Sequence, residues 1–108
     1  MVSHEFKFDS EGYQLVPDSF TEKGFDYKLF KTLKENWQIY SQSKNGMVIS
    51  YELVLLKRQE SYTIAGNTVP KKWTYPSGEH WGIRGFTYKT PEEAEKKFQI
   101  INSRIAQR

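Results

Sequence analysis

The sequence predicts an α+β fold: an antiparallel sheet of about four strands, with a C-terminal amphipathic helix and a shorter N-terminal helix packed on it. Three observations lead to this fold class. A capping signal and an apolar stripe mark a helix near the C-terminus, an Asn-Gly pair joins two apolar runs, and a shorter apolar stripe precedes that pair. We expect one domain over residues 1–108, in which residues 1–24 can form a loosely held arm.

The C-terminal helix has the clearest signals. Thr90, Pro91 and Glu93 form a capping-box pattern, with proline at the first helical position. The apolar stripe that follows has helical spacing and consists of Ala94, Phe98, Ile101 and Ile105. We therefore expect Phe98, at the centre of this stripe, to be buried against the sheet.

A β-hairpin is predicted around Asn45-Gly46, because this pair accepts the positive φ angles of a type I′ turn. If these two residues are the whole turn, Tyr40 pairs with Tyr51 and Trp37 pairs with Val54. The second strand carries apolar side chains on both faces: Tyr51, Leu53 and Leu55 on one, Val54 and Leu56 on the other. This pattern predicts a central strand that is covered on both sides.

The shorter N-terminal helix is predicted from Asp26 to Asn36. Asp26 suits the N-cap, and Phe25 can pack on Phe30 in the hydrophobic-staple arrangement. Gly24 makes an earlier start unfavourable.

The remaining segments have weaker signals. Residues 5–16 alternate around a turn-forming cluster, which predicts a short hairpin or an extended arm. Ser61–Ala65 fits a short strand, and His80–Tyr88 fits a strand in which Gly82 and Gly85 mark a bulge or a close backbone approach.

The composition excludes several kinds of site. The chain has no cysteine, and its two histidines, His4 and His80, are too few for a zinc tetrahedron without several carboxylates. We therefore expect no metal and no cofactor. No signal peptide is visible, and no apolar run approaches the ~20 residues of a membrane span, so a cytoplasmic protein is expected.

The sequence also contains no motif that predicts catalysis. Ser77, His80 and Glu79 lie close in sequence, but side chains so near one another along a strand do not meet as a catalytic triad requires. No nucleophile elbow or phosphate loop occurs. We predict that the protein is not an enzyme.

The candidate binding segment is residues 57–89. This segment contains six Lys and Arg residues but only two Glu residues, which gives a local charge of +4, and six aromatic residues are interleaved with the charged ones. Single-stranded nucleic acid is bound by this combination, because cations follow the phosphates while rings stack on the bases. The residues expected to make these contacts are Lys71, Lys72, Trp73, Arg84 and Lys89.

A structural interpretation of the same segment stays open. Trp81, Phe86 and Tyr88 can belong to the core while the lysines form a solvated face. Trp73 follows a Pro-Lys-Lys sequence in what reads as a loop, where it can be either a binding platform or a lid over the core.

Two runs resemble known families. Residues 81–85, Trp-Gly-Ile-Arg-Gly, together with Ala94 and Phe98 on the following helix, resemble WGR domains, which are small sheet-and-helix modules that bind nucleic-acid ends and nicks. The arginine here is the fourth residue of the motif, whereas that family has a basic residue at the third. Residues 75–88 resemble small uncharacterised proteins of tailed bacteriophages, a resemblance that implies no activity.

Two functions of different class follow. The first is a non-enzymatic accessory protein that binds nucleic acid through residues 57–89. The second is a protein-interaction module, for example a phage-encoded modulator of a host protein. Salt separates them, because affinity for phosphates falls steeply with ionic strength while a ring-dominated protein interface responds far less.

Overall fold

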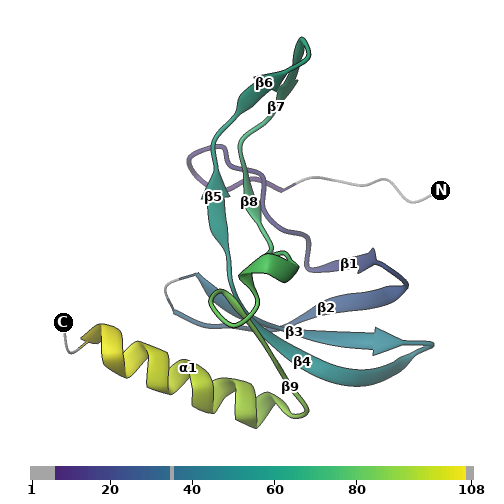
Figure 1. Cartoon of the computed structure of the whole chain (residues 1–108), viewed down its shortest axis with the longest axis vertical. Helices are drawn as coiled ribbons and strands as arrows, with labels where there is room; N and C mark the ends of the chain where they lie inside the picture. Colours follow the sequence, from purple (N-terminus) through teal and green to yellow (C-terminus); the bar gives the residue numbers. More distant parts are fainter. Residues whose placement is uncertain (1–6, 35, 107–108) are drawn as a thin grey trace.

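A five-stranded antiparallel sheet and one helix form the body of the protein. The structure is a computed structural model and describes residues 7–34 and 36–106. The strands lie in the order β1-β2-β3-β4-β9, with bounds Ser19–Glu22, Phe25–Thr32, Trp37–Lys44, Met47–Leu55 and Gly85–Tyr88. The helix α1, Pro91–Ala106, lies along one face of this sheet (Figure 1). His4 lies outside the described residues.

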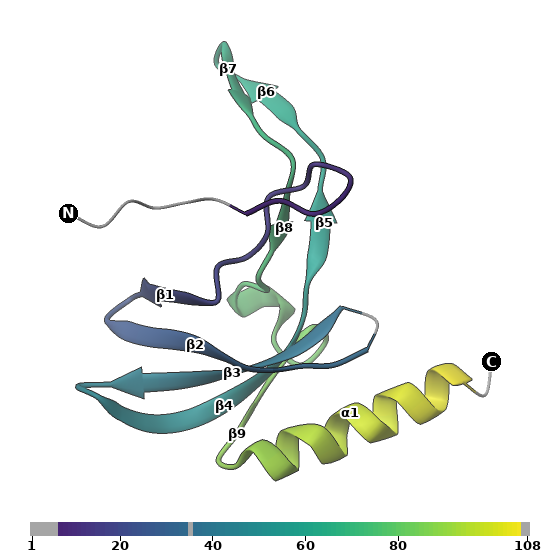
Figure 2. The same cartoon turned by 180° about the vertical axis from the view of Figure 1, so that it is seen from behind.

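Between β4 and β9 the chain leaves the sheet as a long hairpin, residues 57–74, which we call the projecting hairpin (Figures 1 and 2). Its lower part pairs β5 with β8, and its outer part pairs β6 with β7. The bounds of these strands are Lys57–Gln59, Lys72–Thr74, Tyr62–Ile64 and Asn67–Val69. Residues 7–18, the N-terminal loop, cross the lower part in both views, and a short 3-10 helix, Gly78–His80, leads back toward β9.

The predicted fold class is wrong in its sheet size and in its N-terminal helix. The sheet has five strands rather than about four, and residues 25–32 are β2. Tyr27 and Leu29 are partly buried while Asp26 and Lys28 are exposed, so burial has a period of two rather than 3.6. The sequence of this segment fits the apolar pattern of a helix and that of a strand. The strand forms because it pairs with the edge of β3, whose backbone donors and acceptors would otherwise lack partners.

A tight turn that was not predicted from the sequence precedes β2. Lys23 and Gly24 have φ angles of 52° and 84°, and they connect the paired residues Glu22 and Phe25. A two-residue turn with both φ angles positive joins antiparallel strands with the correct twist. Gly24 therefore belongs to the turn of the β1–β2 hairpin and does not precede a helix.

The Asn45-Gly46 turn is confirmed, with both residues at positive φ. The predicted partners are wrong by one residue, because a bulge between Gln42 and Ser43 shifts the register. The observed pairs are Tyr40 with Glu52 and Trp37 with Leu55. Leu53 and Val54 are both 0% exposed, so β4 is covered on both sides as predicted.

The two faces of the sheet carry separate hydrophobic clusters. The cluster on the helix side consists of Trp37, Ile39, Leu53, Ala94 and Phe98. The cluster on the other side consists of Tyr40, Val54 and Leu56, onto which rings from the connection between β4 and β9 pack: Trp73, Tyr75 and Trp81. The second cluster therefore also fixes the base of the projecting hairpin.

The C-terminal helix is confirmed. The backbone N–H of Glu93 donates to Thr90 Oγ1 over 3.2 Å, and that hydroxyl donates to the Glu93 carboxylate over 3.1 Å. Phe98 is 4% exposed, as predicted, while the side chain of Ile105 lies outside the described part of the chain. No helix among the described residues is long and apolar enough to cross a membrane.

The remaining two strand predictions differ in outcome. A short strand at Tyr62–Ile64 is confirmed within the predicted Ser61–Ala65, whereas His80–Tyr88 is a strand only from Gly85 onward. A Cβ at Gly85 would lie less than 3.0 Å from the ring of Trp81. This glycine marks a close approach, which is one of the two roles predicted for it.

Candidate functional site

The N-terminal loop is tied to strand β8 of the projecting hairpin through its backbone. The N–H of Trp73 donates to the carbonyl of Gln14 over 2.7 Å, and the N–H of Gln14 donates to the carbonyl of Lys71 over 3.3 Å. Asp9 reinforces this tie, because its carboxylate accepts a hydrogen bond from Trp73 Nε1 over 2.8 Å. The loop therefore pairs with the edge of β8 in the way that a third strand would.

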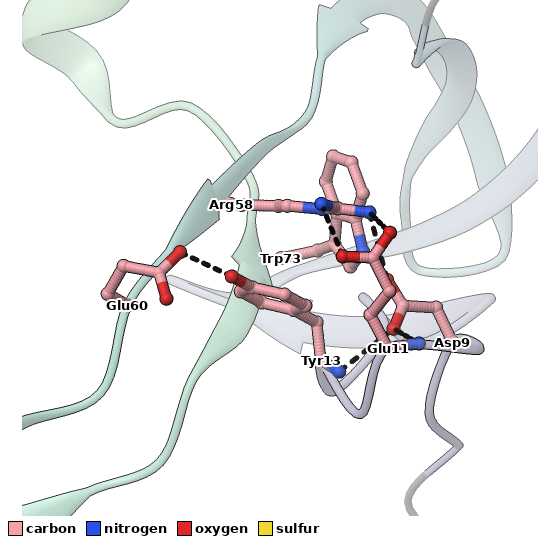
Figure 3. A network of polar contacts seen from close by, with 6 residues as sticks. All are labelled: Asp9, Glu11, Tyr13, Arg58, Glu60 and Trp73. Carbon is pink, nitrogen blue, oxygen red and sulfur yellow. Dashed lines mark hydrogen bonds and ion pairs between the residues drawn. The ribbon is translucent and has the colours of Figure 1, made fainter.

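Arg58 occupies the centre of a polar network between the loop and the hairpin (Figure 3). Its guanidinium donates from Nη1 to Glu11 Oε2 and from Nη2 to Glu11 Oε1, each over 3.1 Å. The same planar group lies 4.7 Å from the ring centre of Tyr13 and 5.1 Å from that of Trp73. The network is an aromatic and charged clasp, in which Arg58 contacts two rings and is hydrogen-bonded to Glu11, with its Nη2 also 3.7 Å from Asp9 Oδ2.

The titration of the clasp residues follows from these contacts. The hydrogen bond from Trp73 is the largest cause that lowers the pKa of Asp9, and backbone N–H donors and Arg58 add to it. The hydrogen bond to Glu11 raises the pKa of Arg58. Tyr13 donates its hydroxyl to Glu60, and this bond raises the pKa of the tyrosine. These contacts favour an ionised Asp9, a protonated Arg58 and a neutral Tyr13, the states in which the clasp contacts form.

A groove of about 720 Å³ lies beside this clasp, at the base of the projecting hairpin. Its charged lining is mostly cationic: Lys57, Arg58, Lys72 and Arg84, with Glu22 as the one carboxylate among the described residues that line it. The aromatic residues of the lining are Phe20, Trp73 and Tyr75. The groove thus combines cations with rings, the combination predicted for this part of the sequence.

Three of the five predicted site residues line the groove, and their side chains differ in exposure and in hydrogen bonding. Lys72 is exposed, whereas Trp73 is partly buried, hydrogen-bonded to Asp9 and covered on one side by Arg58. Arg84 is 9% exposed, and its guanidinium donates to the carbonyls of Leu55 and Thr74 over 3.3 Å. Burial lowers the pKa of Arg84. Arg84 therefore holds the base of the hairpin, and Trp73 is a fixed wall.

The other two predicted residues lie outside the groove lining. The ammonium group of Lys71 lies 4.6 Å from the ring centre of Tyr13, on the side of the N-terminal loop. Lys89 is exposed in the connection between β9 and α1. The structure thus does not gather all five residues at one surface.

Sequence reasoning did not select Lys57, Arg58 or the acidic residues of the loop. Lys57 and Arg58 lie within the basic segment, but nothing in the sequence separates them from the other lysines. No sequence signal links Glu11 with Arg58, because their contact joins positions 47 residues apart.

Ser77 and His80 meet, contrary to the expectation from their spacing. Ser77 Oγ lies 3.0 Å from His80 Nδ1, because residues three apart face each other in a 3-10 turn. The same Nδ1 accepts the backbone N–H of Ser77 over 3.2 Å, and a Glu79 carboxylate oxygen lies 3.8 Å from Nε2. The contact closes the turn. No group of three or more metal-ligating side chains occurs among residues 7–34 and 36–106.

Comparisons of the chain with protein-family models, curated proteins and solved structures found no match. The resemblances to WGR domains and to bacteriophage proteins therefore stay predictions. The candidate site depends on its geometry alone.

Proposed function

We propose that this is a non-enzymatic, cytoplasmic accessory protein that binds single-stranded nucleic acid along the groove at the base of the projecting hairpin. The observation that carries the proposal is the lining of the groove, in which cations outnumber carboxylates and aromatic rings form part of the wall. Single strands are bound by such surfaces, because the cations follow the backbone and the rings accept bases of any sequence.

Lys57 and Lys72 are the phosphate contacts of this proposal. Both are exposed, both line the groove, and they lie on the adjacent strands β5 and β8. Trp73 supplies a fixed ring to the wall, while Arg84 supports the backbone behind it. Lys89 does not line the groove and has no part in this proposal.

The test is fluorescence anisotropy with a labelled oligonucleotide of about 20 nucleotides, titrated at several salt concentrations. The double variant Lys57→Ala with Lys72→Ala should weaken binding and lower the salt slope by up to about 1.4, since each phosphate contact in a single strand contributes about 0.7. The matched control is Lys28→Ala with Lys96→Ala, which removes two exposed cations that do not line the groove.

The control should leave the salt slope within error of the parent protein. Equal losses in the two double variants would mean that net charge rather than the groove controls binding. Failure of the parent protein to bind DNA or RNA in the micromolar range at low salt would overturn the proposal.

One observation favours a protein-interaction module as the second candidate. The outer part of the projecting hairpin exposes Tyr62 (48%) and Ile64 (61%), and residues 61–69 contain no charged side chain. Exposed apolar and aromatic groups without charge are typical of the centre of protein interfaces. Ile64→Asp should abolish binding of a protein partner at this tip while leaving affinity for nucleic acid unchanged.

A further inference from the structure

We propose that Arg58 is a phosphate-binding residue of the groove, and that the Glu11 carboxylate occupies its phosphate position in the free protein. This inference rests on the proposed function, because it assigns a further ligand contact to the same groove. The observation behind it is the two-point contact between the Arg58 guanidinium and Glu11, with both distances at 3.1 Å.

The geometry of this contact suits a phosphate as well as a carboxylate. A guanidinium presents parallel N–H donors in a rigid fork, and both anions offer two oxygen atoms at a matching spacing. A nucleic-acid phosphate that replaces the Glu11 carboxylate would keep both hydrogen bonds. Lysine could not do so, because its ammonium group is a point charge.

Arg58 is already held in a binding conformation. Its guanidinium contacts the rings of Tyr13 and Trp73, at 4.7 Å and 5.1 Å from the two ring centres (Figure 3). Contacts with both rings restrict the guanidinium, and its donor edge is directed at Glu11. A ligand that binds this edge does not have to order a long, flexible side chain, which lowers the entropic cost of binding.

Glu11 can leave without detaching the N-terminal loop. The side chain of Glu11 is 59% exposed and that of Arg58 is 39% exposed, and ion pairs at such positions contribute little to stability. The loop is held independently by the backbone bonds between Gln14 and β8 and by the bond from Trp73 to Asp9. The Glu11 contact is therefore the part of the clasp that can open alone, while Asp9, with Oδ2 3.7 Å from Arg58 Nη2, stays in place.

The position of Arg58 links it to the ligand path. Arg58 and Trp73 line the main groove and also two smaller hollows of about 430 and 420 Å³ beside it. In the β5–β8 pairing, Arg58 and Trp73 project from the opposite face of the hairpin to Lys57 and Lys72. A strand whose phosphates follow Lys57 and Lys72 therefore has to pass round the edge of the hairpin to reach Arg58. Glu11 then competes with the ligand for the fork, and its removal must strengthen binding.

The experiment measures the dissociation constant of the same labelled oligonucleotide for Glu11→Gln, which removes the charge and keeps the size of the side chain. We expect Kd to fall by about two- to fivefold, the range that corresponds to releasing a surface ion pair. The control Glu79→Gln removes an equally negative and more exposed group outside the groove lining, and it should change Kd by less than about 1.5-fold.

A second variant tests the fork itself. Arg58→Lys keeps the charge but loses the two-point contact, so in the Glu11→Gln background it should reverse the gain in affinity. Circular dichroism and thermal unfolding of each variant confirm that the fold is retained.

The outcomes separate this inference from the proposed function. If the parent protein binds and Glu11→Gln gains no more than Glu79→Gln, the Arg58 assignment is wrong while groove binding stands. Loss of stability in Glu11→Gln with no change in Kd would make the pair purely structural. If the parent protein does not bind, the proposed function fails, and the Arg58 assignment, which rests on it, fails as well.

Discussion

Different interactions stabilise the body and the projecting hairpin. In the body, Leu53, Val54 and Ala94 are 0% exposed, and two hydrophobic clusters cover the two faces of the sheet. The hairpin beyond its base buries little, and the N-terminal loop holds it through backbone bonds and the Arg58 clasp. The free energy gained by burial is proportional to the apolar area removed from water, whereas each exposed polar contact contributes little to stability.

The weaker packing of the hairpin indicates where local opening is easiest. Regions with few buried apolar contacts open at lower free energy than the core to which they are attached. The groove lies where these two regions meet, with Phe20 and Tyr75 from the body side and Arg58 and Lys72 from the hairpin. A ligand bound there, as we propose, would contact both the rigid sheet and the less strongly held hairpin.

The largest expected effect is on the body. Phe98→Ala should lower the free energy of unfolding by about 3–5 kcal/mol, because it leaves a cavity between α1 and the sheet. Ile100→Ala, at a position on the same helix that is 48% exposed, should cost less than about 1 kcal/mol. Chemical denaturation measures both, and similar losses would mean that the helix does not pack through Phe98.

An intermediate effect is expected where body and hairpin join. Gly85→Ala should cost about 1–3 kcal/mol, since the new methyl group would overlap the ring of Trp81. Gly78→Ala places its methyl group in open space and should stay within about 0.5 kcal/mol of the parent. Thermal unfolding of the pair tests the close approach, which a tolerated Gly85→Ala would contradict.

A smaller, local effect is expected in the hairpin. Trp73→Phe removes the hydrogen bond to Asp9 and should lower the free energy of local opening by about 0.5–1.5 kcal/mol. Hydrogen exchange should then quicken in residues 7–18 and 57–74. Ser50→Ala removes the hydrogen bond from Ser50 to Gln42 within the sheet and should leave those amides unchanged. Uniform quickening in both variants would show that hairpin and body open together.

The smallest expected effects concern pH, and they have opposite signs in the two regions. Burial raises the pKa of Glu52, while the hydrogen bond from Tyr75 offsets part of that shift. Glu52 therefore lowers the stability of the body as pH rises from its ordinary value of 4.5 through the raised pKa. Glu52→Gln should remove this decline in denaturation curves recorded across that range.

Asp9 should behave in the opposite way. Its pKa lies below its ordinary value of 3.8, so the clasp gains stability above that value and loses it as pH falls through the lowered pKa. Asp9→Asn should abolish this dependence. If the two variants flattened the same limb of the pH profile, the contrast between the regions would be wrong.

Local signals in the sequence determined the elements that end or turn the chain. The capping box at Thr90 and the glycine of the Asn45-Gly46 turn act through bonds and φ angles within a few residues, so their effects are readable without knowing the fold. The apolar residues on both faces of β4 likewise predicted a central strand, because such a strand has only one stable environment.

The tertiary structure alone decided residues 25–32 and the composition of the site. That segment fits a helix and a strand equally well by pattern, and hydrogen bonding to β3 selected the strand. Arg84 and Trp73 resemble free binding residues in the sequence, yet one is buried against carbonyls and the other is held by Asp9. The contact of Arg58 with Glu11 joins distant parts of the chain, and such contacts depend on the packing of the whole fold rather than on local conformational preference.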